Sequence, residues 1–409
     1  MKKEIIIIIL IVIILLVCSF FIFKKEKNKE EITISHNFNI DLIKLVSNDN
    51  KDNYLISPYS IKIALNMLKE GANNNTLKEI DEVLNEPLIN KIDNPNIKIA
   101  NALFIRNKYQ NIIEQKYIST IKNNYNGEIL YDDFNSPKVI NDWVNLHTDK
   151  MIPKILDNIS NDFVLGLANA IAIDVQWEYP FECEVTTKET FTKNDNQKID
   201  TEMMHNSYTD SNVSYFENDK SKGIIIPYQK DTNLEFIGIL PNDINKYLFN
   251  LTADDLLNID NNKKSASNEL HINLSLPRFS YNFDLSTFKN ILIKLGIKDI
   301  FNQSNANLTN IITKENLIKN YLDNIYVDEA IHKSYINLNE KGTKAAAVTY
   351  FGVKANAMPM PSYDTIDINF NKSFIYMIRE KTTKEILFFG VVNTPNKWNG
   401  TTCHNISEN

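Results

Sequence analysis

The sequence lacks the residue sets from which most metal sites, disulfide frameworks and enzyme active sites are built. Its 409 residues include three cysteines, none spaced as Cys-x-x-Cys, which argues against a zinc site and a disulfide framework. The six histidines are far apart, without metal-ligand spacing: His36, His147, His205, His271, His332 and His404. No Gly-x-Ser-x-Gly elbow, His-Glu-x-x-His pair, phosphate-binding glycine loop or Rossmann fingerprint is present. We therefore expect a protein that is not an enzyme and uses no metal or cofactor.

The charge balance is acidic. The chain carries 44 Lys and Arg against 51 Asp and Glu, a net charge of −7, with no lysine-arginine stripe. Nucleic-acid binding is not expected, because neutralising phosphates requires clustered cations. A hydrophobic content of 43% is typical of a folded chain, and no linker or repeat interrupts residues 35–398. These residues are predicted to form one large domain, followed by a tail at 399–409, and the protein is expected to be a monomer.

The N-terminus carries the longest apolar run. Residues 5–23 contain no charge and are flanked by lysines on both sides. Nineteen helical residues rise about 28 Å, enough to cross a bilayer core. Residues 1–31 are therefore predicted to be a membrane anchor and charged spacer that hold the domain at the cell surface. Secretion after cleavage, or lipidation at Cys18, are the alternatives.

Within the domain, helices lead and strands dominate the second half, which predicts an α+β fold with antiparallel sheets. The predicted helices are 60–71, 75–84 and 285–295. The predicted strands are 164–175, 234–240, 326–338 and 385–392. Whether Cys183 pairs with Cys403 is left open, since two distant cysteines can equally be free thiols.

Residues 342–361 form a long segment between two predicted strands. Loops of this length in a compact domain are usually functional or disordered, and this one lacks the polarity of disorder. Read with a period of two, one face is uncharged and can be buried: Thr343, Ala345, Ala347, Thr349, Phe351 and Val353. The two lysines, Lys344 and Lys354, fall on the other face. The segment is therefore interpreted as a latent strand, the alternatives being a third hairpin strand or a helical turn.

Several stretches in order along the chain resemble the serpin family. Glu340-Lys-Gly-Thr-Lys-Ala-Ala-Ala is similar to the serpin hinge, with Lys344 where a glutamate is common. The other stretches are Asn53-Tyr-Leu-Ile-Ser-Pro-Tyr-Ser, Asn141-Asp-Trp-Val, Asn169 to Phe181, Leu276-Pro-Arg-Phe, Ile331-His-Lys and Phe389-Gly-Val-Val-Asn-Thr-Pro. The resemblance covers some 340 residues after the apolar run.

This resemblance implies a fold of three β-sheets, eight or nine helices and an exposed reactive loop at about 342–361. It implies irreversible inhibition of a serine or cysteine protease, in which the cleaved loop inserts into the main sheet as a new strand. The implied hinge residues are Glu340, Gly342, Thr343, Ala345, Ala346 and Ala347. The implied structural residues beneath the parting strands, and at the point where insertion begins, are Ser57, Ser60, Asn169, Trp177 and His332.

The reactive bond follows from a count along the loop. In inhibitory serpins it usually lies after the seventeenth residue from the hinge glutamate, which from Glu340 gives Asn356–Ala357. Small flanking residues favour an elastase-like or subtilisin-like serine endopeptidase as the partner. An asparagine-directed cysteine protease is the runner-up, and Lys354 offers a trypsin-like enzyme an earlier bond. A non-inhibitory serpin-like binding or chaperone module is the alternative function, and an anchored enzyme is a distant third.

Overall fold

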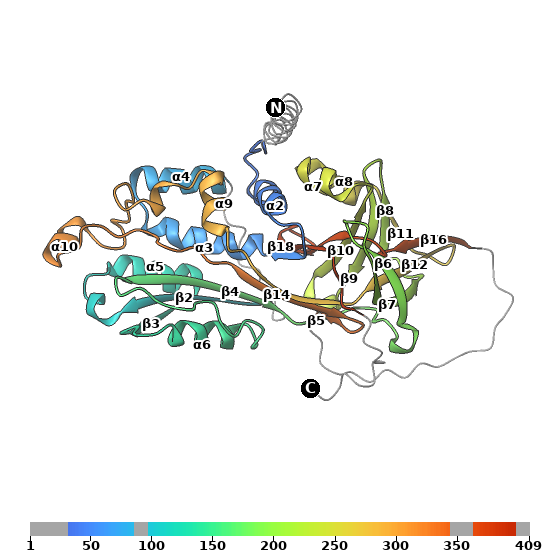
Figure 1. Cartoon of the computed structure of the whole chain (residues 1–409), viewed down its shortest axis with the longest axis horizontal. Coiled ribbons are helices and arrows are strands. Elements are labelled where there is room, and N and C mark those ends of the chain that lie inside the picture. The colour runs from blue at the N-terminus through green and yellow to red at the C-terminus, as the bar shows by residue number, and fades with distance from the viewer. Residues whose placement is uncertain (1–31, 86–96, 344–362, 398–409) are drawn as a thin grey trace, which may run out of the picture. The chain divides into compact units, whose positions relative to one another are not determined.

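The computed structural model describes residues 32–85, 97–343 and 363–397. The chain divides into two units, Met1–Ser35 and His36–Asn409, and every helix and strand below belongs to the second (Figure 1). In these residues the α-helices are α2 (Phe38–Asp49), α3 (Pro58–Gly71), α4 (Asn74–Leu84), α5 (Gln115–Tyr125), α6 (Lys138–His147), α7 (Ile244–Phe249), α8 (Ala253–Asn261), α9 (Phe288–Leu295) and α10 (Lys314–Lys319). The α+β class is confirmed.

The strands pair into four hydrogen-bonded sheets within the described residues. The largest runs β1 (Tyr54–Ile56), β18 (Ile386–Val392), β17 (Phe374–Glu380), β10 (Leu234–Pro241), β9 (Ser221–Pro227), β8 (Ser214–Glu217) and β11 (Lys263–Ser265). A second runs β16 (Asp364–Asn369), β12 (Leu270–Pro277), β7 (Lys198–Tyr208) and β6 (Thr187–Thr192). A third runs β13 (Phe279–Asp284), β14 (Lys333–Asn339), β15 (Gly342–Thr343) and β5 (Val175–Gln176). The fourth runs β3 (Glu128–Asp132), β2 (Ile97–Arg106) and β4 (Leu165–Ile173).

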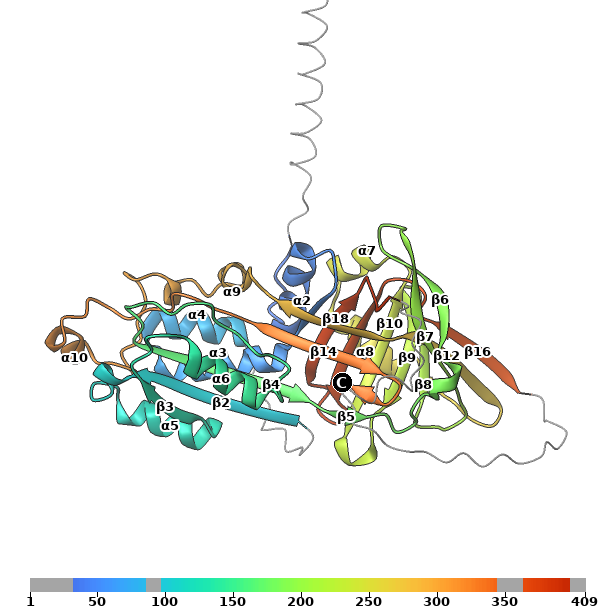
Figure 2. The ribbon, with the colours of Figure 1, turned by 60° about the horizontal axis from the view of Figure 1, so that its bottom comes forward.

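The third and fourth sheets are two halves of one larger sheet. β4 continues almost directly into β5, which belongs to the other half. Figure 2 shows β4 and β14 running side by side, yet no ladder joins them in the described residues. The three sheets implied by the resemblance are therefore present, with the main one parted along its length.

Local sequence explains the element ends. The Ser57 side chain caps α3 by accepting a hydrogen bond from the Ser60 N–H, and Pro58 occupies the first helical position, where no N–H is needed. The helix ends at Gly71, where a Cβ would lie 2.3 Å from Ile311. A capping box of Thr252 and Asp255 starts α8.

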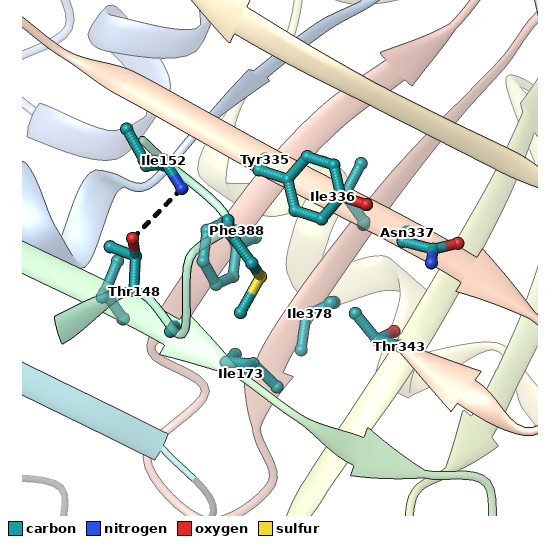
Figure 3. Close-up of a pocket in the computed structure, with 12 residues that line it drawn as sticks. Thr148, Ile152, Ile173, Tyr335, Ile336, Asn337, Thr343, Ile378 and Phe388 are labelled. Carbon is teal, nitrogen blue, oxygen red and sulfur yellow. Dashed lines mark hydrogen bonds between the residues drawn. The ribbon is translucent and has the colours of Figure 1, made fainter. Parts of the chain in front are cut away.

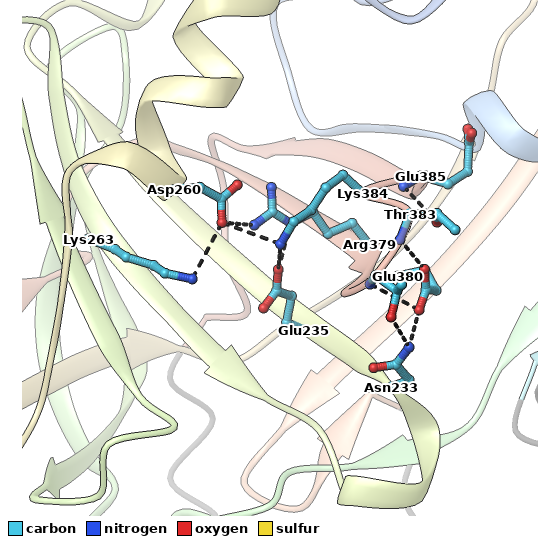
Figure 4. A network of polar contacts seen from close by, with 10 residues as sticks. Asn233, Glu235, Asp260, Lys263, Arg379, Glu380, Thr383, Lys384 and Glu385 are labelled. Atoms are coloured by element: carbon cyan, nitrogen blue, oxygen red, sulfur yellow. Dashed lines mark hydrogen bonds and ion pairs between the residues drawn. The ribbon is translucent and has the colours of Figure 1, made fainter.

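Continuous apolar runs became the central strands. All residues of β10, β17 and β18 are buried, because helices cover one face of this sheet and the main sheet covers part of the other. The charged exceptions are paired: Arg379 donates to Glu235 at 2.7 Å and to Asp260 of α8 at 2.8 Å (Figure 4). This network holds α8 against β10 and β17.

Two predicted elements begin later than expected. Helix α9 starts at Phe288, because residues 285–287 form the turn that precedes it. The strand predicted at 326–338 is regular only from Lys333. Its partner β13 ends at Asp284, opposite Lys333, and β4 is not paired to it. Within the part of the chain that the structure describes, residues 326–332 therefore have no neighbouring strand.

Candidate functional site: a parted sheet with a hinge at one end

The space between β4 and β14, here called the seam, is the candidate site (Figure 3). We call the end of the seam that lies at Thr343 its upper end. The half of the seam at that end is mainly apolar and is lined by Ile171, Ile173, Ile336, Ile378 and Phe388. Its lower half is more polar and is lined by Ser57, Ser60, Asn169, His332 and Ser334. Unpaired strand edges facing one another inside a protein are unusual, because backbone groups are normally paired.

The hinge closes the upper end of the seam. Gly342 and Thr343 form β15, which pairs with β14 on one side and with β5 on the other. Gly342 has φ +153°, and a Cβ there would lie 2.1 Å from the Val175 carbonyl oxygen. Only glycine fits this close approach of two backbones. A short strand is thus already inserted where the two half-sheets meet.

Thr343 points into the protein. Its side chain is buried, and its hydroxyl lies 2.6 Å from the Tyr228 hydroxyl. Burial raises the pKa of Tyr228, so this phenol stays protonated and can donate. The predicted inward face of the latent strand therefore begins with a side chain that is already inside.

Trp177 forms the floor beneath the hinge. Its ring stacks on Tyr228 at 4.6 Å between centroids, and it is almost fully buried. The indole N–H donates to the Asn339 carbonyl at 2.9 Å, and the Trp177 backbone N–H donates to the Lys341 carbonyl at 2.9 Å. One residue thus holds the chain on both sides of Glu340.

Glu340 is held by an ion pair that sequence reasoning missed. The Arg278 Nε lies 2.7 Å from both Glu340 carboxylate oxygens, and the Thr186 hydroxyl donates to the same carboxylate at 2.5 Å. Arg278 also contacts Glu202 at 3.3 Å. All three charged side chains are buried, so two carboxylates share one guanidinium. Arg278 lies in the Leu-Pro-Arg-Phe stretch, but nothing in that stretch names its partners.

The predicted residues beneath the seam lie on its two sides and are joined at the start of α3, where the Ser57 hydroxyl accepts a hydrogen bond from the Ser60 N–H at 3.2 Å. On the β14 side, the Ser57 backbone N–H donates to the His332 Nε2 at 3.2 Å. On the β4 side, the Ser60 hydroxyl bonds to the Asn169 side chain, which donates to Asn101 at 2.7 Å. Both groups line the lower seam.

His332 is neutral. Its Nε2 accepts a hydrogen bond and so carries no proton, and burial lowers its pKa to about 4, with the Asp284 charge opposing this shift.

A covering segment, residues 148–159, follows α6 and passes over the seam, where Thr148, Ile152 and Ile155 join its lining. The Asn141 side chain holds it in place. Its oxygen accepts from the Ile155 and Leu156 N–H groups, and its nitrogen donates to the Leu156 carbonyl, each at 2.9 Å. Any strand that enters the seam must pass beneath this segment.

Some predicted residues lie outside the described residues: Ala345, Ala346, Ala347, Asn356 and Ala357. Cys183 forms a disulfide bond, and the two other cysteines, Cys18 and Cys403, lie outside the described residues. Across the described ranges, no group of three or more His, Cys, Asp or Glu side chains could hold a metal ion.

The sheets, with β15 paired into both halves of the parted one, form a serpin fold. The family model "Serpin (serine protease inhibitor)" matches residues 33–395, and this chain belongs to the serpin family. Members of this family are in general protease inhibitors rather than enzymes, and proteases are the partners they act on.

The curated relatives extend over almost the whole chain. An uncharacterized serpin-like protein of Methanosarcina acetivorans is 29% identical, covering 87% of this chain and 84% of the relative. Human Serpin B4 is 30% identical and human leukocyte elastase inhibitor 28%, each covering 88% of this chain and 97% of the relative.

The solved structures agree. Native tengpin, a thermophilic serpin, has a TM-score of 0.74 at 28% identity, covering 88% of this chain and 93% of that one. Latent tengpin has a TM-score of 0.71 at 27% identity, covering 88% of this chain and 96% of that one.

The expected location at the cell surface is wrong. Among the described residues no helix is long and apolar enough to cross a membrane. The apolar run at 5–23, on which that expectation depended, lies outside them. An apolar run of this length is long enough to cross a membrane, but the length alone does not establish a membrane-spanning helix.

Proposed function

We propose that this protein irreversibly inhibits serine endopeptidases by inserting its cleaved reactive loop into the seam. The observation that carries the proposal is β15. Gly342 and Thr343 pair with both half-sheets, and next to them the facing edges of β4 and β14 have no partner among the described residues. A strand that continues from Thr343 would complete both ladders.

The register begun by β15 matches loop residues to the seam lining. Each step forward from Thr343 is one step back along β14, and also one step back from Val175 toward β4. Continued in this register, Ala345 would lie between Ile336 and Ile173 in the apolar half. Thr349 would lie between His332 and Asn169 in the polar half, where its hydroxyl could bridge the two sides of the seam. In this register the small apolar side chain of Ala345 would face the apolar half of the seam, and the hydroxyl of Thr349 would face the polar half.

Insertion of this length releases substantial free energy. About a dozen residues would form roughly 10–15 backbone hydrogen bonds, each contributing about 1 kcal/mol net, so the driving force is on the order of 10 kcal/mol. The covering segment opposes entry, because it is held by Asn141 and must be lifted. The native state is therefore metastable in this proposal.

The chemical step belongs to the protease. Its serine oxygen attacks the Asn356 carbonyl carbon, the bond to Ala357 breaks, and the Ala357 amine takes a proton and leaves. Asn356 then carries an ester to the serine. Insertion of the freed strand moves the attached protease and deforms its active site before water can hydrolyse the ester.

For the target we propose an elastase-like or subtilisin-like enzyme, because Ala355 and Ala357 flank the bond with small side chains. The similarity to a relative named leukocyte elastase inhibitor supports this choice. An asparagine-directed cysteine protease is second, and a trypsin-like enzyme cutting after Lys354 would leave a shorter strand to insert.

The test is incubation with a panel of these proteases followed by denaturing electrophoresis and mass spectrometry. A covalent adduct and a released fragment that starts at Ala357 are expected. A fragment starting at Ala355 or Pro359 would refute the assigned bond. Cleavage without any adduct, and without a rise in melting temperature of tens of degrees, would refute insertion and favour the non-inhibitory binding module.

A further inference from the structure

The end of the domain at α10 displays an unusual group of apolar side chains. Among the described residues, seven large hydrophobic side chains are exposed, and three of them fall within nine positions: Ile318, Tyr321 and Tyr326. Ile318 is 76% exposed and Tyr321 is 98% exposed. Figures 1 and 2 place α10 at the opposite end of the domain from β6, β7 and β16. We call these three residues the α10 patch.

The backbone at Tyr321 is held in a conformation that side chains disfavour. Leu322 N–H donates to the Leu317 carbonyl at 3.0 Å, and Tyr321 N–H donates to the Ile318 carbonyl at 3.2 Å. This is a Schellman motif at the end of α10, with Tyr321 at the left-handed position, φ 55°, where glycine is usual. A tyrosine here opposes local stability, and its almost complete exposure gives no compensating burial within the described domain.

The register of the hinge leads to this same end of the domain. Because Gly342 pairs with Asn339 and Thr343 with Leu338, the thirteen residues that follow would run back along β14 and the segment before it. If residues 325–332 extend β14 as the loop pairs with them, that register would place Asn356 beside Ile325, next to Tyr326. A protease esterified to Asn356 would therefore arrive against the α10 patch.

We infer that the α10 patch is the contact surface for the esterified protease after loop insertion. The inference rests on the proposed function and identifies which residues meet the displaced enzyme. Aromatic side chains are enriched among residues that dominate protein interfaces, and Tyr321 and Ile318 are free to be covered. Contact at this surface would keep the deformed protease from recovering and would lengthen the life of the ester.

The test is Tyr321→Gly, measured with pancreatic elastase. Glycine relieves the left-handed conformation, so the melting temperature of the free protein should stay equal or rise. The rate of adduct formation should be unchanged, because the patch lies beyond the end of β14 that is opposite the hinge. The adduct should release active protease about fivefold to tenfold faster, as expected for loss of one interface tyrosine. A stabilising substitution that weakens the trap has no explanation in a purely structural role.

The matched control is Asn196→Gly. Asn196 is also exposed and left-handed, φ 67°, in the turn between β6 and β7 at the other end of the domain. It should leave the adduct lifetime unchanged. Equal lifetimes for Tyr321→Gly and the unsubstituted protein would overturn this inference alone, as would a shorter lifetime accompanied by a lower melting temperature. If the unsubstituted protein forms no adduct with elastase or the rest of the panel, the proposed function falls, and this inference with it.

Discussion

Acid should weaken this fold through one histidine. His332 is buried at the lower seam and accepts a hydrogen bond from the Ser57 N–H at Nε2. Protonation at Nε2 would destroy that bond and place an unpaired charge in a buried position. The folded pKa is lowered from 6.5 to about 4, so the unfolded chain takes up the proton first as the pH falls.

The size of the effect follows from the two pKa values. The stability contributed by neutral His332 is fully present above pH of about 6.5 and is lost as the pH falls toward 4. A difference of about 2.5 pKa units corresponds to about 3 kcal/mol. With about 2.1 cal/mol/K of unfolding entropy per residue, a domain of this length should lose about 4 °C in melting temperature.

The assay is thermal unfolding of the unsubstituted protein and of His332→Gln between pH 7.5 and pH 4. Glutamine can still accept from the Ser57 N–H but does not titrate in this range. The unsubstituted protein should lose about 4 °C more than the variant across the range, while His271→Gln, outside the seam, should behave as the unsubstituted protein. Parallel pH curves for the unsubstituted protein and His332→Gln would refute the reasoning.

Three further substitutions test other parts of the site. Thr343→Arg should turn the inhibitor into a substrate, because the buried position cannot accept an unpaired guanidinium without several kcal/mol of cost; Lys344→Arg is the control, and equal trapping by both in electrophoresis would contradict the assigned faces. Arg278→Leu should lower the free energy of unfolding by about 3–5 kcal/mol by leaving two buried carboxylates unpaired; adding Glu202→Gln should restore part of this in denaturant titrations, and no restoration would argue against shared charge. Asn141→Ala should lower the free energy of unfolding by about 2 kcal/mol and should speed insertion, because it loosens the covering segment. Adduct formation measured by stopped flow should therefore be faster than in the unsubstituted protein, and slower formation would contradict this role of Asn141.

The elements that could be predicted are those whose signals are local. Ser57, Pro58 and Gly71 mark the ends of α3 within one stretch of chain, and the apolar runs of β10 and β18 are long enough to indicate buried strands. The burial of Thr343, the first residue of the predicted inward face, could be predicted because alternation is a property of neighbouring residues. The serpin resemblance supplied the number of sheets.

Other features depend on residues that are distant in sequence. Arg278, Glu202 and Glu340 come from three separate stretches. In the sequence, nothing near any one of them distinguishes it from a charge on the surface. The late start of β14 depends on where β13 ends and on the open state of the seam, and neither is encoded in residues 326–332. The left-handed backbone of Tyr321 could not be predicted, because this position at the end of a helix is usually glycine or asparagine and tyrosine does not indicate a turn.

The short strand β15 has a consequence for the kinetics of insertion. Bringing two distant chain segments into register is the entropically costly part of forming a sheet, and later residues add one after another at lower cost. In the proposed mechanism that first encounter precedes cleavage of the loop, since Gly342 and Thr343 already hold the alignment with both half-sheets. Insertion would then proceed by adding residues one after another to a strand that is already in register. Its speed would be governed by how quickly the covering segment lifts, and the length of the free loop would matter little.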